Sequence, residues 1–518
     1  MTESSTPADL AARAAEKHVV VIGGGIGGLL AALECAKVGM RVTLLEATDA
    51  VGGAIRRTEL DGVVLDAGAE SFATRGGHVR SLLQDLGLTD RIVAPAAGSA
   101  WLAGIPGVGA APLPVGGILG IPANPFQDDV RRVIGWSGAW RAYLDRVRPP
   151  LTIGHQASLG RLVASRMGPK VRDRLVAPVT TGVYSASPDD VDVDVAAPGL
   201  NSALTRVGSL SGAVEALRDE AASKAASAKA AAKAAAKAPG AAVEGLLGGM
   251  STLVDALLHD LERLDVVVHT GIRVEGVTRD DALWTVVARP QEPEPEPEPE
   301  PETETEEGVP QDDDRHVLTA DAVIVATEEH VARALLAESV PALSTAVAAA
   351  APEIEIVTLL LDAPALDAAP RGTGVLTVPG SHTAKALTHS TAKWEWVRAA
   401  AGRRHVVRVS FGAQGEPAAT AALDDEAAAR LALSEASALL GVPLAASTLV
   451  AADRSRYVQS QPASIIGSGE RRAAARAAVQ ETPGLAAVGA WLAGTGLAQV
   501  VPDAVGEADR LRRALLWE

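Results

Sequence analysis

Three glycines and one glutamate near the start of the chain have the types and spacing of a dinucleotide-binding turn. Gly23, Gly25 and Gly28 form the pattern G-x-G-x-x-G directly after the apolar run at residues 18–22. The first glycine allows a tight turn, the second lets the backbone approach a pyrophosphate, and the third allows close helix–strand packing. Glu46 follows 18 residues after Gly28, where a carboxylate can accept hydrogen bonds from ribose hydroxyls.

The residues around this turn predict the elements that would hold it. Residues 18–22 suit a buried parallel strand, and residues 29–38 carry small and apolar side chains at helical spacing. Residues 41–46 are expected to form the second strand. Together these segments predict one right-handed βαβ unit, in which the N-terminus of the helix faces the negative charge of a phosphate.

Further elements are expected along the rest of the chain. A helix is expected over residues 249–258, and a second sheet from residues 357–361 and 406–411. The most apolar stretch, residues 101–122, contains four prolines. It could not satisfy the backbone hydrogen bonds of a membrane span and is expected to be a loop or the wall of a pocket. Other expected elements are strands at residues 266–269, 272–277, 284–288 and 322–326, and a strand, turn and helix within residues 485–501.

One segment of biased composition is rich in alanine and lysine. Residues 221–238 contain little else, which predicts a helix. Lys229, Lys233 and Lys237 fall on one face of this helix. The basic stripe is interpreted as a solvated helix face, with binding of a membrane or of propionate groups as the alternative.

A second biased segment carries most of the net negative charge. Residues 291–314 hold twelve acidic residues and no basic ones, so the net charge of −17 becomes −17 + 12 = −5 without them. The remaining chain is only mildly acidic and shows no basic face interleaved with aromatic residues, which argues against a nucleic-acid partner. The Glu-Pro repeat in this segment predicts an extended, disordered loop joining the strands at residues 284–288 and 322–326.

Cysteine and histidine usage excludes several other kinds of site. Cys35 is the only cysteine, and the polar N-terminal residues lack the apolar core of a signal peptide. We therefore expect a reducing, cytoplasmic setting and no transmembrane span. The ten histidines are scattered without metal-ligand spacing. We accordingly predict no metal site, and the sequence indicates no catalytic residue.

A second pair of glycines follows Glu46 and distinguishes between dinucleotides. Gly52 and Gly53, with Arg56 shortly after them, resemble the corresponding segment of FAD flavoproteins of the glutathione-reductase type, in particular the amine oxidase and protoporphyrinogen oxidase superfamily. The resemblance implies FAD as the cofactor. No second dinucleotide motif is evident, because the glycines within residues 245–249 are not expected to follow a strand. The reduced flavin would then be reoxidised by O2 or another acceptor.

The next segment resembles a narrower group within that superfamily. Residues 66–75, DAGAESFATR, are similar to the signature of bacterial protoporphyrinogen and coproporphyrinogen oxidases. Two departures lie at the C-terminal end of the expected site. Tyr457 stands where the family usually has a tryptophan, and residues 498–503 lack the two glycines that the family has there. Further similar segments are found at residues 178–184, 207–213, 248–253, 390–394, 488–494 and 501–503.

The resemblance also implies a set of residues that contact the cofactor. Val274 would contact the adenine through its backbone, with a plain core valine as the alternative. The full set expected to bind FAD is Gly23, Gly25, Ile26, Gly27, Gly28, Glu46, Ala47, Gly53, Ala54, Arg56, Gly68, Ala69, Glu70, Ser71, Val274, Tyr457, Gly494, Gln499, Val500 and Val501.

The fold implied is of the α/β class, with a Rossmann-like FAD-binding domain of the glutathione-reductase type. A mixed-sheet substrate domain and a mainly helical inserted domain would complete it. The FAD-binding domain would come from three segments, residues 16–95, 241–345 and 481–518. Residues 96–240 would form the helical domain at the substrate pocket, and residues 346–480 the substrate-binding sheet domain.

The activity implied is the oxidation of coproporphyrinogen III to coproporphyrin III in haem biosynthesis, with protoporphyrinogen IX as the alternative substrate. Six electrons would leave in three flavin cycles, and three O2 would become three H2O2. Arg75, Lys393 and Arg408 are candidates for binding the acidic arms of the porphyrinogen. For each of them a solvated surface charge is the alternative interpretation. The resemblance leaves open whether the protein makes transient contact with other enzymes of the haem pathway.

Two more distant functions also remain at this point. A flavin amine oxidase or a carotenoid desaturase could use the same scaffold. Amine oxidases typically build an aromatic cage beside the flavin, and this chain has only 8 Trp, 3 Tyr and 3 Phe. A non-catalytic FAD-binding protein is the other alternative, because a fold does not fix a function.

Overall fold

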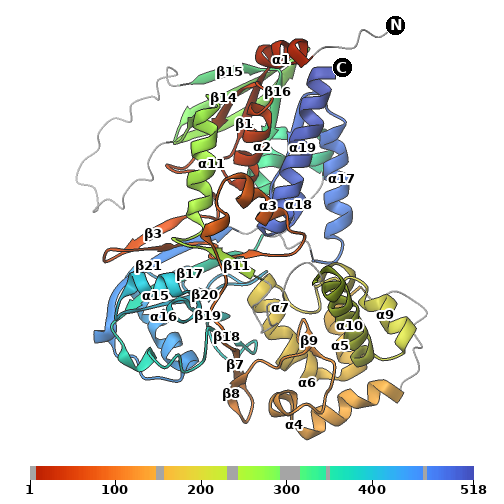
Figure 1. Ribbon diagram of the computed structural model, residues 1–518, viewed down its shortest axis with the longest axis vertical. Helices are drawn as coiled ribbons and strands as arrows, with labels where there is room; N and C mark the ends of the chain where they lie inside the picture. Colours follow the sequence, from red (N-terminus) through yellow and green to blue (C-terminus); the bar gives the residue numbers. More distant parts are fainter. Residues whose placement is uncertain are drawn as a thin grey trace, which may run out of the picture.

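The computed structural model describes residues 7–147, 157–229, 243–291, 315–345, 351–458 and 464–517, without the side chains of residues 7–8, 224–229 and 345. Its main chain forms three layers of structure. A parallel sheet with its helices lies at the top of Figure 1, a mixed sheet lies below it on one side, and a group of helices lies below it on the other. The described parts of both chain ends lie at the top.

The parallel sheet has five strands, in the order β12-β2-β1-β16-β22. Val19 and Val21 of β1 point into one core, whereas Val20 and Ile22 point into another. Because both faces are covered, every residue of β1 is buried, and this explains its uninterrupted apolar run. The strands are β12 (Val267–His269), β2 (Arg41–Leu45), β1 (His18–Ile22), β16 (Ala322–Val325) and β22 (Leu485–Ala487).

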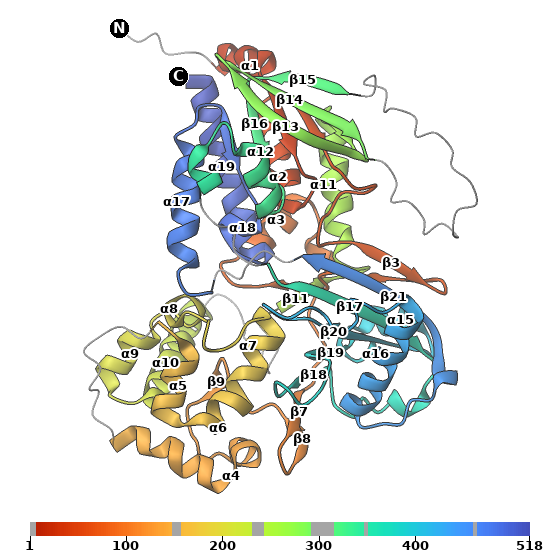
Figure 2. The ribbon, with the colours of Figure 1, turned by 180° about the vertical axis from the view of Figure 1, so that it is seen from behind.

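Different elements cover the two faces of this sheet, as Figures 1 and 2 show from opposite sides. One face packs against α2 (Ile26–Ala36), α11 (Ser251–Arg263), α19 (Leu497–Trp517) and α3 (His78–Asp85). The other face packs against an antiparallel sheet and three helices. These are β13 (Ile272–Asp280), β14 (Leu283–Pro290), β15 (His316–Ala320), α12 (Glu329–Leu336), α17 (Ser468–Gln480) and α18 (Ala490–Ala493), with α13 (Pro341–Thr345) beside α12.

The mixed sheet has seven strands in the order β21-β17-β20-β19-β18-β7-β8. One face packs against α16 (Asp425–Leu440), and the other turns toward the upper layer, where β3 (Arg57–Leu60) and β4 (Val63–Asp66) lie. The strands are β21 (Leu449–Val458), β17 (Glu353–Leu361), β20 (His405–Phe411), β19 (Ala386–His389), β18 (Gly374–Thr377), β7 (Ala100–Ile105) and β8 (Gly109–Pro112), with α14 (Ser390–Lys393) and α15 (Glu395–Ala401) between β19 and β20.

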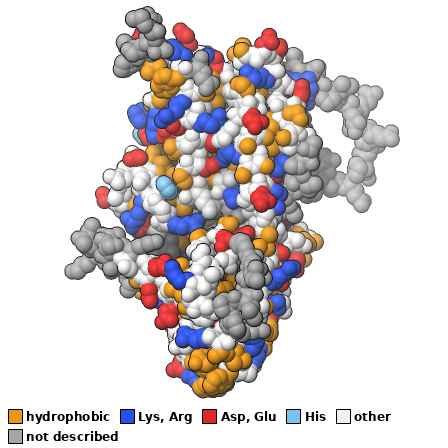
Figure 3. Space-filling model, turned by 90° about the vertical axis from the view of Figure 1, so that its right-hand side faces the viewer, with side chains coloured by type: hydrophobic (Ala, Val, Ile, Leu, Met, Phe, Trp, Pro, Cys, Tyr) orange, Lys and Arg blue, Asp and Glu red, His pale blue; other side chains and the backbone are white. Residues whose placement is uncertain are grey.

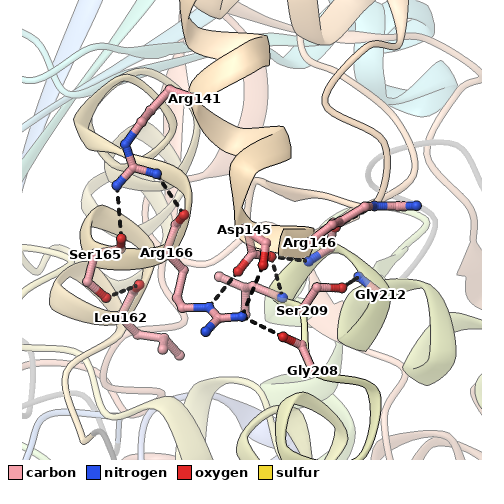
Figure 4. A network of polar contacts seen from close by, with 11 residues as sticks. Arg141, Asp145, Arg146, Leu162, Ser165, Arg166, Gly208, Ser209 and Gly212 are labelled. Carbon is pink, nitrogen blue, oxygen red and sulfur yellow. Dashed lines mark hydrogen bonds and ion pairs between the residues drawn. The ribbon is translucent and has the colours of Figure 1, made fainter. Parts of the chain in front are cut away.

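The helical layer is held together by a buried ion pair (Figure 4). The guanidinium of Arg166 donates from Nε to Oδ1 of Asp145 at 2.5 Å, and from Nη2 to the carbonyl of Gly208 at 2.6 Å. Asp145 is fully buried, and its Oδ2 accepts the amide of Leu210 at 2.5 Å. This carboxylate therefore caps α10. The helices are α4 (Asp128–Tyr143), α5 (Leu159–Met167), α6 (Pro169–Val171), α7 (Ala177–Tyr184), α8 (Val193–Ala196), α9 (Leu200–Val207) and α10 (Leu210–Lys229).

Four of the fourteen aromatic residues gather at α4, on the outer side of the helical layer. Phe126 contacts the rings of Trp136, Trp140 and Tyr143. Trp136 is 61% exposed and Trp140 is 57% exposed. In Figure 3 hydrophobic side chains gather at the lower tip of the molecule, where α4 lies in Figure 1. These aromatic residues therefore lie at the opposite end of the molecule from the parallel sheet.

Three expectations about local structure are wrong. Residues 101–122 are not a loop, because they contain β7, β8, β9 (Gly117–Ile118) and β10 (Ile121–Pro122). Positive φ angles at Gly107 and Gly109 allow the turn between β7 and β8. Strand β7 pairs in parallel with β18, more than 270 residues later in the chain, and no local pattern reveals such a pairing.

The other two corrections concern short strands. Gly248 and Gly249 do follow a strand, β11 (Val243–Leu246), but it pairs antiparallel with β5 (Phe72–Ala73) and β6 (Ile92–Val93), outside the parallel sheet. The acidic segment does not lead from β14 directly to β16, because β15 lies between them. Residues 292–314, and residues 230–238 of the alanine- and lysine-rich segment, lie outside the described residues.

Among the described residues, no helix combines the length and apolar character that crossing a membrane requires. The same residues hold no group of three or more His, Cys, Asp or Glu side chains that could bind a metal ion.

Candidate functional site: a glycine-lined cradle

The glycine turn connects β1 to α2 at the carboxyl ends of the parallel strands, and two of its glycines are required by close contacts. A β-carbon at Gly23 would lie 2.7 Å from the carbonyl oxygen of Ala326. A β-carbon at Gly28 would lie 1.9 Å from the carbonyl oxygen of Gly23. A β-carbon at Gly25 would have nothing within 4 Å. The turn therefore packs tightly behind Gly23 and Gly28 and leaves an open space at Gly25.

Glu46 follows β2 and lies at the same edge of the sheet. Its Oε2 accepts the amide of Gly24 at 2.6 Å, and its Oε1 accepts the amide and the hydroxyl of Thr48, each at 2.8 Å. A carboxylate offers about four acceptor positions. The glycine turn thus orients Glu46, and one position remains for a ligand hydroxyl.

The second glycine pair lies directly against the first turn. The amide of Gly52 donates to the carbonyl of Gly24 at 2.8 Å, and a β-carbon at Gly53 would lie 3.3 Å from Cα of Gly25. Both residues of the pair have positive φ angles, +120° and +60°. Two glycine-lined segments therefore meet at the N-terminus of α2, where the first amides of the helix have no partner within it.

The remaining predicted residues of this part surround the same edge. Ile26 and Gly27 form the first turn of α2, and Ala47 follows Glu46 in the chain. The amide of Ile272 donates to the carbonyl of Glu46 at 2.8 Å, which brings the start of β13 to this edge. Val274 is 9% exposed and belongs to the core beneath it.

The C-terminal part of the chain returns to the glycine turn. A β-carbon at Gly27 would lie 3.4 Å from Cα of Gly489. Gly494 has a φ angle of +103° and ends α18, after which α19 begins. Val500 and Val501 are buried in the first turns of α19. Oε1 of Gln499 is buried without a hydrogen-bond partner among the described residues, so a polar acceptor near this helix end is left for a ligand.

Gly68 lies where the upper layer meets β21 of the mixed sheet. A β-carbon there would lie 2.0 Å from the carbonyl oxygen of Ala54 and 2.9 Å from the hydroxyl of Tyr457. The amide of Ala69 donates to the carbonyl of Ala54 at 3.1 Å, and the guanidinium of Arg56 lies 5.1 Å from the ring centre of Tyr457. The hydroxyl of Tyr457 is buried and finds no hydrogen-bond partner among the described residues. The structure thus brings five of the predicted residues together here.

Glu70 forms the centre of a buried ion-pair cluster. Nζ of Lys393 donates to its Oε1 at 2.6 Å, and Nη1 of Arg408 to its Oε2 at 3.2 Å. Arg408 also donates to the carbonyls of Ala67 at 2.7 Å and Gly68 at 2.5 Å. Burial alone would raise the pKa of Glu70, but the two cations hold it at about 2. Ser71, the next predicted residue, follows directly and is half-buried.

The three predicted substrate cations therefore have different surroundings. Lys393 and Arg408 are only 19% and 7% exposed, so they are not solvated surface charges, and their charge is compensated by Glu70. Arg75 is exposed. It lies close enough to Tyr184 to lower the pKa of that phenol partly, although burial raises it overall.

Asp66, which sequence reasoning did not single out, supports the same segment. It ends β4, and its Oδ1 accepts the amide of Met250 at 2.8 Å, just before α11 begins. Burial raises its pKa to about 7, although Arg408 and the Met250 amide act in the opposite direction. Residues 66–70 are thus fixed by α11 on one side and by β20 on the other.

The raised pKa of Asp66 predicts how folding stability depends on pH. The folded protein holds the Asp66 proton more tightly than the unfolded chain, so ionisation should lower stability as pH rises from about 4 to about 7. The Asp66→Asn variant keeps a side-chain oxygen that can accept a hydrogen bond from the Met250 amide, but it has no carboxyl group to ionise. The variant should therefore not lose stability through this ionisation. In urea unfolding, the free energy of unfolding of the variant relative to that of the wild type should increase between pH 4 and pH 8, by about a few kcal/mol at most. If the free energies of unfolding of the two proteins changed with pH in parallel, the result would contradict the burial of an ionisable Asp66.

Comparison with known proteins identifies the group to which this site belongs. The model of the flavin containing amine oxidoreductase family matches residues 26–511. A coproporphyrinogen III oxidase of Propionibacterium freudenreichii is 29% identical, over 96% of this chain and 91% of its own length. One of Mycobacterium tuberculosis is 30% identical, over 95% of both chains.

Two solved structures named as oxidases have a similar fold. A structure from Exiguobacterium sp. 255-15, named as a candidate protoporphyrinogen oxidase, aligns with a TM-score of 0.76 at 21% identity, over 96% of this chain and 98% of the other. A putrescine oxidase bound to putrescine aligns with a TM-score of 0.61 at 16% identity, over 96% and 98%. At these identities the likeness concerns the fold alone.

The cradle suits the cofactor of this family. The space at Gly25 and the free amides of α2 suit a diphosphate, the remaining acceptor of Glu46 suits a ribose hydroxyl, and the unpartnered Gln499 and Tyr457 suit a polar ring system. The chain belongs to the family of flavin containing amine oxidoreductases, and its cofactor is FAD.

Proposed function

We propose that this protein oxidises coproporphyrinogen III to coproporphyrin III, with O2 as the electron acceptor. The observation that carries the proposal is the similarity, over nearly the full chain, to coproporphyrinogen III oxidases. The segment that resembles these enzymes in sequence, residues 66–75, is also the segment that the Glu70 cluster fixes beside the cradle.

FAD supplies the redox chemistry, by accepting a hydride from a saturated ring carbon of the porphyrinogen. The residues of the chain bind and orient the reactants. Gly25, Gly53 and the start of α2 would bind the diphosphate, and Glu46 would bind the ribose. Arg408 and Lys393 hold Gly68 and Glu70 in place. Loss of a proton from a pyrrole nitrogen demands no strong base, so no catalytic residue is assigned.

The remaining predicted contacts keep their roles in this proposal. Val274 contributes backbone atoms near the adenine, and Tyr457, Gln499 and Val500 lie toward the flavin. Arg75, Lys393 and Arg408 are the residues predicted to bind substrate carboxylates. Among the described residues, Arg75 is the exposed one of the three, so its charge can meet a carboxylate of the substrate. Lys393 and Arg408 act on the substrate through the segment that they position.

The purified protein is expected to be yellow and to form a fluorescent porphyrin when coproporphyrinogen III is added in air. Removal of six electrons predicts three H2O2 for each porphyrin formed, which a peroxide assay measures. Protoporphyrinogen IX and a primary amine, assayed in parallel, test the alternative substrates. A protein that releases no FAD on denaturation would contradict the cofactor, and turnover of the amine alone would contradict the substrate.

A further inference from the structure

Lys385 is a half-buried lysine outside the cradle that forms no ion pair with a carboxylate among the described residues. It directly precedes β19, and its main chain is fixed because its amide donates to the carbonyl of Ser410 at 2.9 Å. Its Nζ donates to Oγ of Ser185 at 2.7 Å. Ser185 is the residue that ends α7, with a φ angle of +54° that only a few non-glycine residues adopt.

The ammonium group of Lys385 lies in surroundings that do not compensate its charge. Among the described residues no carboxylate oxygen forms an ion pair with it, whereas Lys393 of α14 and Arg408 of β20 both reach Glu70. Burial is the only cause that shifts its pKa, which falls to about 7. A buried cation without an anion is costly, and such groups are normally paired.

A second buried polar group lies beside the same serine. The amide of Gln414 donates to the carbonyl of Ser185 at 2.8 Å, and Oε1 of Gln414 is buried without a hydrogen-bond partner among the described residues. Ser185 therefore contacts both Lys385 and Gln414. The ammonium group of Lys385 has no anionic partner, and Oε1 of Gln414 has no hydrogen-bond donor, among the described residues. A ligand would satisfy both if it offered a carboxylate to Lys385 and a hydrogen-bond donor, such as an N–H or O–H group, to Oε1 of Gln414.

The position of this cluster suits the proposed substrate. Ser185 follows Tyr184, which lies near Arg75, and Val183 of the same helix end is 64% exposed. A β-carbon at Gly182 would lie 2.5 Å from the side chain of Leu376 in β18, so α7 lies directly against the mixed sheet. Lys385 and Arg75 thus both lie near the end of α7, which packs against the mixed sheet.

We propose that Lys385, held by Ser185, binds a carboxylate of the substrate and selects for a porphyrinogen with many acidic arms. This inference rests on the proposed function. Coproporphyrinogen III carries four propionates and protoporphyrinogen IX carries two. A lysine at this position, in addition to Arg75, therefore favours the substrate with four carboxylates.

The test uses the FAD-loaded enzyme and measures the dissociation constant of coproporphyrin III, the product, from its fluorescence. Lys385→Met keeps the length of the side chain and removes its charge. We expect the dissociation constant and the KM for coproporphyrinogen III to rise about tenfold or more, as a lost charged hydrogen bond predicts. The KM for protoporphyrinogen IX should change less, and the FAD content should not change.

Lys170→Met is the matched control. Its ammonium also donates to a serine hydroxyl, Ser137, at 2.8 Å, but on the outer side of the helical layer. This variant should bind coproporphyrin III as the wild type does. Lys385→Gln provides a second neutral variant in case Lys385→Met does not fold, and a thermal melt identifies which of them is folded.

Different failures can be told apart. A folded, FAD-loaded Lys385 variant that binds coproporphyrin III within twofold of the wild type would overturn the role of Lys385 and leave the proposed function intact. A wild-type enzyme that neither binds coproporphyrin III nor oxidises its porphyrinogen would overturn the proposed function, and the inference with it.

Discussion

Replacing Gly25 by valine is expected to abolish FAD binding while the protein still folds. The φ angle of Gly25 is −67° and its ψ angle is 172°, a conformation that valine adopts readily. A β-carbon there meets no protein atom within 4 Å, so the new side chain would enter only the space that the diphosphate needs. The ratio of flavin to protein absorbance after purification measures the loss.

The controls for Gly25→Val separate loss of the cofactor from loss of the fold. The melting temperature of the variant should match that of wild-type protein stripped of FAD, because bound ligand itself stabilises the folded state. Gly28→Val should instead unfold well below the stripped wild type, since its β-carbon would lie 1.9 Å from the carbonyl oxygen of Gly23. A Gly25→Val protein that retains its flavin would contradict the location of the diphosphate.

Replacing Glu70 by alanine is expected to destabilise the protein by about 3–5 kcal/mol, the usual cost of removing one partner from a buried ion pair. The substitution leaves the buried Arg408 and the half-buried Lys393 without an anion. The bonds from Arg408 to the carbonyls of Ala67 and Gly68 would then have to hold this segment without Glu70. Chemical denaturation at neutral pH measures the change, and the FAD content should fall with it.

An exposed ion pair provides the comparison for Glu70→Ala. Asp255 pairs with Arg57, and both side chains are more than half exposed. Asp255→Ala should cost less than about 1 kcal/mol. Equal effects of the two substitutions would contradict the buried cluster. Because the folded pKa of Glu70 lies at about 2, the stabilisation that Glu70 provides is complete above about pH 4.5 and is lost as pH falls toward 2.

The cradle could be predicted from sequence because its residues are close together in the chain. Gly23, Gly25 and Gly28 follow a strand within a few positions of one another, and Glu46 ends the next strand. The glycine spacing and the apolar runs are both local patterns, which single-sequence reasoning reads well. The βαβ unit is therefore found where it was expected, with small differences at the ends of its elements.

The contacts between layers could not be predicted in the same way. Glu70 meets Lys393 and Arg408 across more than 300 residues of chain, and residue type alone favoured two solvated cations. The parallel pairing of β7 with β18 likewise joins distant segments, and the glycine- and proline-rich sequence alone predicts only a loop or the wall of a pocket there. Lys385 carries no local signal, because its contact with Ser185 depends on the end of α7 meeting the start of β19.

The unpartnered hydroxyl of Tyr457 shows how the structure extends the sequence argument. The sequence indicated only that a tyrosine replaces the tryptophan of the family at this position. In the structure its hydroxyl lies beside Gly68, and the guanidinium of Arg56 lies over its ring. The structure thus places Tyr457 of β21 against Gly68 and Arg56, two residues from the opposite end of the chain.

The central claim is that a porphyrinogen delivers its electrons to the FAD held in this cradle, and anaerobic mixing tests it most directly. Coproporphyrinogen III, added without oxygen to the purified yellow protein, should bleach the flavin absorption band while the porphyrin absorption band appears. Admission of air should then restore the flavin band. A flavin band that coproporphyrinogen III leaves unchanged, and that an amine bleaches instead, would contradict the account.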